Sequence, residues 1–311
     1  MNNASRDRAA AQSFEAGPRR KRFLIVRNPH AGLKGARLVA QVVGALTAQG
    51  ALAHVVETVD AGSVRSVLAA EGDIDAVVAA GGDGTVRALA LTLSDLGLDL
   101  PVGIIPAGTG NVLANEIGLP RDAHRLADYL VGSPACTVRV MQANEEPFLL
   151  MASSGFDAEV LLRLSVRLKQ RIARAAYALP TLSTLAHMRL TPFSVIVDGV
   201  AHEATWVIVA NARTYGGSFH LVSGASIFDD RLQAVLFSAR TRAGRIRELA
   251  WLAAGRAERC AGITVIGCRQ VEIQAPRQMP SQIDGDALGF GPVTIAPSQR
   301  SIRLIVPPDA R

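Results

Sequence analysis

Cysteine, lysine and aromatic residues are scarce in this sequence of 311 residues, and each shortage argues against a class of protein. The three cysteines, Cys136, Cys260 and Cys268, form no C-x-x-C pair. Their number and spacing argue against a disulfide framework or a zinc site and favour a reducing compartment. Aromatic residues make up 5% of the chain and lie mainly in apolar patterns, so we expect no nucleic acid partner.

Long hydrophobic runs are also missing from the sequence. No stretch approaches the roughly 20 apolar residues that a membrane-spanning helix needs. Residues 1–22 lack the apolar segment of a secretory signal. We expect residues 1–20 to form a disordered tail. The sequence therefore favours a cytoplasmic protein whose contact with membranes is peripheral.

Nearly all of the positive charge is arginine, since only three of the 33 basic residues are lysines and thirty are arginines. The formal net charge is +6. A GC-rich coding sequence would produce this bias, and so would affinity for phosphate or anionic lipid; the sequence leaves both explanations open. A hydrophobic content of 49% describes a folded protein with room for one large domain or two ordinary ones.

The chain divides into two halves by the rhythm of its apolar runs. In residues 21–134, short apolar runs alternate with helical patterns, which predicts an α/β domain with a doubly wound, mainly parallel sheet. Residues 135–311 instead contain closely spaced strand patterns, with helical patterns at 158–189 and 243–256. We expect a β-rich second domain, whose last strand is able to return to the first domain.

A glycine-rich junction follows the third predicted strand, where Gly81, Gly82, Asp83, Gly84 and Thr85 precede a helix. The carboxyl ends of strands in doubly wound sheets are where ligands bind. Glycine allows close backbone approach, and a helix amino terminus offers N–H groups to an anion. We interpret the junction as a phosphate loop, with a plain strand-to-helix turn as the alternative.

Two well-known phosphate loops are excluded. A Walker loop needs lysine after glycine, and none of the lysines follows a glycine. The dinucleotide fingerprint G-x-G-x-x-G needs a third glycine. At that position the first glycine loop of this chain has Arg87 and the second has Leu113. The main sequence signal for an enzyme that transfers hydride with a dinucleotide cofactor is therefore missing.

Two further polar turns repeat the design of the first. Asn28 follows the first predicted strand, and residues 108–111, Gly-Thr-Gly-Asn, follow the fourth. Turns at successive strand ends gather along one edge of a parallel sheet, so the pattern predicts a cleft for a polyphosphate.

The segments N-P-H-A-G, G-G-D-G-T and P-A-G-T-G-N, in this order, resemble the diacylglycerol kinase catalytic-domain family, which includes bacterial lipid kinases, sphingosine kinases and ceramide kinases. The resemblance continues through residues 155–160, 211–219, 228–235 and 282–289. It implies an α/β domain like those of 6-phosphofructokinase and NAD kinase, joined to a β-sandwich-like domain. It also implies MgATP as phosphoryl donor and a lipid hydroxyl at a membrane surface as acceptor.

The resemblance also implies roles for individual residues. The nucleotide pocket would be formed by Asn28, Thr58, Gly81, Gly82, Asp83, Gly84, Thr85, Gly108, Thr109 and Asn111. Asp83 would orient Mg²⁺ or the reacting hydroxyl. Asp284 and Asp286 match the acids of the family's Asp-Gly-Glu segment, which are associated with general-base function. On an extended chain these two carboxylates would point the same way; a structural Asp-Gly turn is the alternative.

A structural Mg²⁺ site is implied at Asp230, with the backbone carbonyls of Ile227 and Leu232 as further ligands. The family usually has glycine after this acid, whereas this chain has Arg231, so a plain turn is the alternative. Two other departures weaken the resemblance. Arg87 and Ala88 stand where the family has Asn-Glu, and Asp286 replaces a longer glutamate.

The sequence leaves alternative functions and partners open. An NAD kinase-like enzyme would share G-G-D-G-T, although P-A-G-T-G-N and I-D-G-D-A-L-G argue against it. A catalytically silent nucleotide- or lipid-binding protein is the other alternative. Residues 158–189 form a basic amphipathic pattern that predicts a membrane contact or, alternatively, a helix covering the sandwich. A homodimer is left open.

Overall fold

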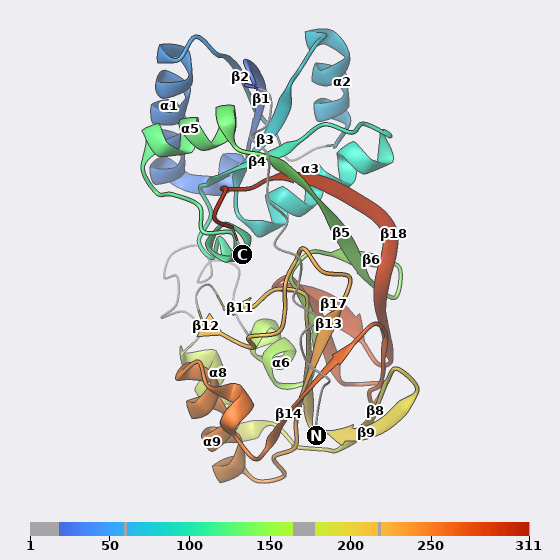
Figure 1. Ribbon diagram of the computed structural model, residues 1–311. Coiled ribbons are helices and arrows are strands. Elements are labelled where there is room, and N and C mark those ends of the chain that lie inside the picture. Colours follow the sequence, from blue (N-terminus) through green and yellow to red (C-terminus); the bar gives the residue numbers. More distant parts are fainter. Residues whose placement is uncertain (1–18, 59–60, 164–177, 217–218, 311) are drawn as a thin grey trace, which may run out of the picture.

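The computed structural model describes residues 19–58, 61–163, 178–216 and 219–310 (Figure 1). The predicted tail and the middle of the 158–189 pattern lie outside these residues. The described ends of that pattern form α6 (Phe156–Arg163) and α8 (Ala178–His187).

The first half of the chain forms a parallel sheet between two layers of helices. Its strands are β1 (Arg22–Arg27), β2 (Leu52–Glu57), β3 (Ala76–Gly81) and β4 (Val102–Pro106), and they lie in the order β2-β1-β3-β4. The helices are α1 (Gly32–Ala48), α2 (Ala61–Glu71), α3 (Asp83–Asp95), α4 (Val112–Glu116) and α5 (Ala123–Gly132), with η1 (Pro29–Ala31) after β1.

Alternate residues of the strands point to opposite faces, and both faces are buried. Phe23 and Ile25 of β1 pack in a core with α1 and α5, whereas Leu24 of β1 packs in the core that includes α2 and α3. This explains the nearly unbroken apolar runs of the strands, since a strand covered on both faces has no polar side. The predicted doubly wound α/β architecture is confirmed.

The long strand β18 (Val293–Ile305) carries the parallel sheet into the second half of the molecule (Figure 1). Near its end Leu304 pairs with Val102 of β4, and along its length it pairs antiparallel with β5 (Ala135–Ala143). The sheet then continues through β15 (Val271–Gln274), β8 (Phe193–Val197) and β9 (Val200–Ala204), with β6 (Glu146–Phe148) beside β5. The larger sheet thus passes through both halves.

A second, antiparallel sheet packs against this extension. Its strands are β7 (Met151–Ser154), β10 (Trp206–Ala210), β13 (Leu232–Phe237), β14 (Ile263–Cys268), β16 (Pro280–Ile283) and β17 (Asp286–Phe290). Val195 and Ile273 from one sheet share a core with Val207 and Ile283 from the other. The predicted β-sandwich-like second half is therefore confirmed.

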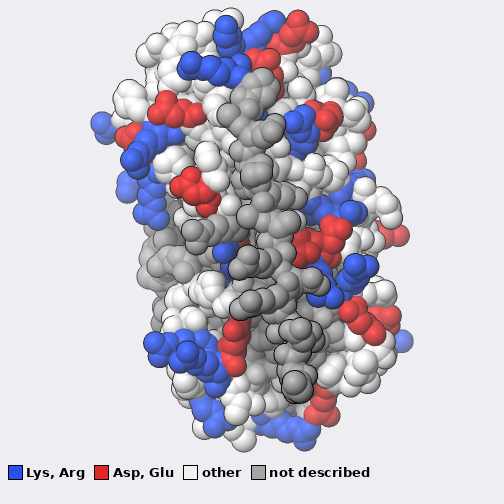
Figure 2. All heavy atoms as spheres, in the orientation of Figure 1, with Lys and Arg blue, Asp and Glu red and all other residues white. Residues whose placement is uncertain are grey.

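Shorter elements complete the described chain: β11 (Thr214–Tyr215), β12 (Phe219–His220), α9 (Arg242–Ala253) and η3 (Ala257–Arg259). An Asp-Gly hairpin joins β8 and β9, where Asp198 and Gly199 have positive φ angles of 46° and 85°. Figure 2 shows basic and acidic side chains mixed over one face. Arg side chains lie at the end where Figure 1 places α8 and α9, and basic side chains also lie at the opposite end.

Candidate active site

The three polar turns predicted from the sequence meet at the carboxyl edge of the parallel sheet. The side-chain amide of Asn28 donates to Thr85 Oγ1 at 3.1 Å, which joins the first turn to the loop after β3. The backbone N–H of Ala107 donates to the Gly81 carbonyl at 3.1 Å, which joins that loop to the turn after β4. The predicted convergence of the loops is therefore observed.

Glycine is required where these loops touch. A Cβ on Gly108 would lie 2.3 Å from the Cα of Gly82, and a Cβ on Gly81 would lie 2.3 Å from Thr85 Oγ1. Either distance is too short for any other residue without movement of its neighbour. The glycines thus allow the two loops to pack directly against each other.

Asp83 connects the two glycine loops. Its carboxylate accepts the backbone N–H groups of Val112 at 2.9 Å and Leu113 at 2.8 Å, at the start of α4. Burial raises the pKa of the Asp83 carboxyl above its ordinary value, and these N–H donors oppose the rise. The contacts of Asp83 in this structure are therefore with protein backbone, and its role toward Mg²⁺ stays a prediction.

Asn111 also acts within its own loop. Its backbone is left-handed, with φ 47° and ψ 46°. Its side chain accepts the N–H of Gly108 at 3.0 Å and donates to the Gly108 carbonyl at 2.8 Å. Thr109 lies between these anchors. Thr58 follows β2, and its N–H donates to the carbonyl of Arg27 at 3.1 Å, one strand away from the loop after β3.

The carboxylate segment of the second half lies in a tight hairpin, and the expectation that it is extended is wrong. Asp284 and Gly285 have φ angles of 50° and 86° and connect β16 to β17, with Ile283 paired to Asp286. Positive φ at both central residues is the conformation that an Asp-Gly turn favours in a two-residue hairpin. Asp284 and Asp286 are close for this reason, not because they alternate along a strand.

The two acids have different surroundings. The side chain of Asp284 is 1% exposed and accepts the backbone N–H groups of Leu149, Leu150 and Met151 at 2.8–3.1 Å. Burial raises the pKa of Asp284 above its ordinary value, opposed by these donors and by the Arg87 guanidinium. The side chain of Asp286 is 53% exposed. Asp284 therefore anchors the turn, and Asp286 presents a solvent-accessible carboxylate.

Arg87 joins this turn to the first half of the chain. It lies in the first turns of α3, and its Nη2 is 2.7 Å from Asp286 Oδ2 while its Nη1 is 3.6 Å from Asp284 Oδ2. Sequence reasoning noted Arg87 only as a departure from the family pattern. Asp286 Oδ2 also lies 4.0 Å from the point where a Cβ on Gly84 would stand. The glycine loop after β3, the Arg87 guanidinium and the Asp286 carboxylate from the other half thus lie close together.

The predicted structural Mg²⁺ site lies elsewhere and stays a prediction, because the contacts of Asp230 and Leu232 in this structure are with other protein groups. Asp230 accepts a hydrogen bond from Arg139 Nε at 2.7 Å, so a guanidinium already neutralises this carboxylate. The Leu232 carbonyl, a proposed ligand, accepts the thiol of Cys268 at 3.6 Å, and Ile227 is buried. Among the described residues no cluster of three or more His, Cys, Asp or Glu side chains could hold a metal.

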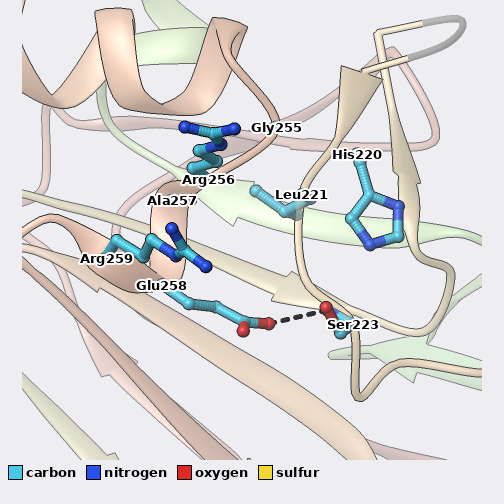
Figure 3. Close-up of a pocket in the computed structure, with 8 residues that line it drawn as sticks. All are labelled: His220, Leu221, Ser223, Gly255, Arg256, Ala257, Glu258 and Arg259. Carbon is cyan, nitrogen blue, oxygen red and sulfur yellow. Dashed lines mark hydrogen bonds between the residues drawn. The ribbon is translucent and has the colours of Figure 1, made fainter.

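A cavity of about 210 Å³ lies between β12 and the segment that follows α9 (Figure 3). Glu258 reaches across it and accepts the backbone N–H of Ser223 at 2.7 Å, while His220 stands on the opposite wall. None of the residues that line this cavity belongs to the glycine loops or to the Asp284 turn. The phosphate loops and the cavity are thus separate features.

Comparison with known proteins agrees with this geometry over most of the chain. The family described as "Diacylglycerol kinase catalytic domain" matches residues 22–143, and the family described as "YegS C-terminal NAD kinase beta sandwich-like domain" matches residues 151–306. The chain belongs to the diacylglycerol kinase family. The resemblance noted from the sequence motifs is therefore confirmed.

Relatives in this family span nearly the whole chain at modest identity. A Mycobacterium tuberculosis protein named diacylglycerol kinase is 30% identical over 259 residues, which cover 80% of this chain and 82% of the relative. A Bacillus subtilis protein of the same name is 26% identical over 92% of this chain and 97% of its own. A crystal structure of a diacylglycerol kinase from Bacillus anthracis superposes with a TM-score of 0.68 at 18% identity, covering 95% of this chain and 100% of that one. This last similarity concerns the fold.

Proposed function

We propose that this protein is an ATP-dependent lipid kinase, which transfers the γ-phosphoryl group of MgATP to the hydroxyl of a diacylglycerol-like or sphingoid lipid. Membership of the diacylglycerol kinase family supports phosphotransferase chemistry. The observation that carries the proposal is the approach of Asp286, from the second half of the chain, to Gly84 of the phosphate loop. A kinase needs a proton acceptor beside the transferred phosphoryl group, and this approach provides one.

The loops would bind the nucleotide phosphates. Gly81, Gly82 and Gly84 allow the backbone to approach closely, and α3 begins at Asp83, so its first N–H groups face the same edge of the sheet. The second loop differs, because the N–H groups that begin α4 are already bonded to Asp83. We therefore assign phosphate binding chiefly to the loop after β3. Mg²⁺ would enter with ATP as part of the substrate.

The reacting centre would consist of Asp286 and Arg87. The lipid hydroxyl oxygen would form a bond to the γ-phosphorus as the bond to the ADP oxygen breaks, and Asp286 would accept the hydroxyl proton. Arg87 orients Asp286 through the 2.7 Å contact and places a fixed positive charge beside the phosphoryl group. Asp284 would hold the turn in place, since its carboxylate is already bonded to three backbone N–H groups.

The acceptor's location implies a membrane contact, for which the end of the molecule with α8 and α9 is our candidate. Leu182 of α8 and Ile246 of α9 are exposed, and Arg242 and Arg247 are exposed on α9. The acid of α9, Glu248, is buried. Exposed apolar side chains flanked by arginines suit the interface of an anionic bilayer. The basic side chains at this end in Figure 2 support the same assignment. No helix of the described residues is both long and apolar enough to cross a bilayer.

A transfer assay with radiolabelled ATP separates this proposal from its rivals. Purified protein would be incubated with Mg²⁺, labelled ATP, NAD and vesicles that contain diacylglycerol, sphingosine or ceramide. If the proposal is right, radiolabelled phosphate will appear in one of the lipids. Label in NADP would indicate an NAD kinase-like enzyme instead, and nucleotide binding without any labelled product would indicate a silent binding protein. Either of these results would overturn the proposal.

A further inference from the structure

We infer that Glu116 is a positioning residue that holds the acceptor side of the cleft in register with the phosphate loops. This inference rests on the proposed function, because it assigns Glu116 a role in the same transfer reaction. Glu116 is the last residue of α4 and belongs to no motif that the sequence singled out.

The contacts of Glu116 cross between the two halves of the molecule. Its side chain is 2% exposed. Oε1 accepts the backbone N–H of Arg213 at 3.1 Å and Arg213 Nε at 3.0 Å. Oε2 accepts the backbone N–H of Thr214 at 2.9 Å and Thr214 Oγ1 at 2.6 Å. A buried carboxylate with four donors fixes both the position and the orientation of the segment that it binds.

On one side Glu116 is tied to the phosphate loop. Its helix, α4, follows the Gly-Thr-Gly-Asn loop directly and is held at its start by Asp83. Asp83 in turn is the first residue of α3, two residues after Gly81. A displacement of the loop after β3 would therefore be transmitted to Glu116 through one short helix.

On the other side, a series of contacts leads from the segment that Glu116 binds to the turn that contains Asp284 and Gly285. Tyr215 follows the bound segment, and its hydroxyl donates to Asp157 Oδ2 at 3.3 Å. Asp157 also accepts Nε2 of Gln282 at 3.2 Å. Oε1 of Gln282 accepts the backbone N–H of Gly285 at 2.8 Å, within the turn between the two acids. Apart from the peptide link between Thr214 and Tyr215, each step is a hydrogen bond between described residues.

Arg87 provides a second connection to the same turn, because from α3 it bonds directly to Asp286. The halves are already joined through the sheet, because β18 pairs with both β4 and β5. The bonds of Glu116 and Arg87 add two side-chain connections next to the phosphate loop, which fix the positions of the two walls there. Phosphoryl transfer requires this, since a misplacement of about 1 Å reduces the rate roughly a hundredfold.

Glu116→Gln tests the inference, with Glu258→Gln as the matched control. Glu258 also accepts a backbone N–H, that of Ser223, but lies in η3 away from the loops. We expect Glu116→Gln to lower kcat for lipid phosphorylation at least tenfold while the Kd for MgATP changes less than twofold, and Glu258→Gln to change neither. An unchanged kcat, or an equal loss of nucleotide binding and turnover, would overturn the inference.

Thr214→Val provides a second variant in case Glu116→Gln folds poorly. It removes only the bond from the Thr214 hydroxyl to Oε2 and leaves the bond from the backbone N–H, so we expect a smaller loss of kcat. Combining it with Glu116→Gln should add no further loss, because both substitutions interrupt the same contact. Additive losses in kcat would contradict the inference.

Hydrogen exchange provides a readout that does not depend on lipid turnover. The probe is the Mg²⁺ complex of a non-hydrolysable ATP analogue, and exchange is followed at the backbone N–H groups of residues 213–215. We expect the analogue to slow exchange there in the wild-type protein and not in Glu116→Gln. If the wild-type protein phosphorylates no lipid, the proposed function fails and this measurement still decides the role of Glu116. If the analogue does not slow hydrogen exchange at residues 213–215 of the wild-type protein, the proposed role of Glu116 is wrong.

Discussion

The guanidinium of Arg87 lies between the carboxylates of Asp284 and Asp286, with Nη1 3.6 Å from the first and Nη2 2.7 Å from the second. Arg87 comes from the helix after the phosphate loop, and the two acids come from a hairpin almost 200 residues further along the chain. The residue that departs from the family pattern is thus a contact between the two walls of the proposed cleft.

Arg87→Ala should therefore affect both activity and stability. We expect kcat to fall at least tenfold, because Asp286 loses its orienting partner and the phosphoryl group loses a nearby charge. The unfolding free energy should fall by about 1–3 kcal/mol, since the buried Asp284 carboxylate loses a charged neighbour. Kinetics and chemical denaturation measure these effects. Arg87→Lys keeps the charge but not the fork geometry and should retain part of the stability. Wild-type turnover in Arg87→Ala would contradict this role.

Asp284→Asn and Asp286→Asn should separate anchoring from chemistry. Asn at position 284 brings an N–H₂ group toward backbone donors, so we expect a loss of about 1–3 kcal/mol in unfolding free energy. Asn at position 286 is exposed and should leave stability within about 0.5 kcal/mol of the wild-type value. Thermal unfolding of both variants provides the measurement. Equal stability of the two would refute the division of roles.

The pKa of Asp157 predicts a pH dependence of stability. Burial raises the pKa of this carboxyl above its ordinary value, despite hydrogen bonds from Ser153 and Trp206. The folded protein therefore keeps a proton at a pH where the unfolded chain has lost it. The resulting stabilisation is complete below the ordinary pKa of about 3.9 and is lost as pH rises through the raised pKa.

Asp157→Asn removes the titrating carboxyl, so a comparison with the wild-type protein shows whether its protonation raises or lowers the stability. We expect the difference in unfolding free energy, wild type minus variant, to increase as the pH is lowered from neutral toward the ordinary carboxyl pKa. Urea denaturation at several pH values measures it. Parallel curves for the two proteins would show that the carboxyl does not titrate in this way.

The pairing of Asp230 with Arg139 predicts that no structural metal supports the fold at this place. A chelator in excess should leave the Tm unchanged in the absence of nucleotide. Arg139→Ala leaves Asp230 without its guanidinium, and because the pair is largely exposed we expect a loss of only about 0–1 kcal/mol. A chelator-induced fall in Tm would indicate a metal that the described residues do not account for.

The proposed membrane contact is tested by changing Ile246 to Glu. This places an acid among exposed arginines of α9 and should reduce sedimentation with anionic vesicles severalfold. Leu52→Glu is the matched control, since Leu52 is also exposed but lies on β2, at the opposite end of the molecule in Figure 1. Equal loss of vesicle binding in both variants would argue against the α8 and α9 end as the contact.

The sequence predicted the architecture because its signals are local. A strand buried on both faces reads as an unbroken apolar run, and three turns at the ends of parallel strands have to meet at one edge. The positions of Asn28, Thr85 and Gly108 follow from this rule.

The partners of the polar side chains could not be predicted in the same way. Spacing does not tell whether a carboxylate in a loop faces a ligand or a neighbouring N–H group, and Asp83 and Asp284 both face backbone N–H groups. The contacts of Arg87 and Glu116 join residues about 100–200 positions apart. Such pairs depend on how the two halves pack, and no local pattern encodes them.

The most direct test of the account compares the wild-type protein with Asp286→Asn in the transfer of labelled phosphate from MgATP to lipid in anionic vesicles. We expect labelled lipid from the wild-type protein. In Asp286→Asn we expect a rate at least a hundredfold lower, with the Kd for MgATP within twofold of the wild-type value. Equal rates for the two proteins would remove Asp286 as the proton acceptor. No labelled lipid from a wild-type protein that binds MgATP would contradict the proposed function itself.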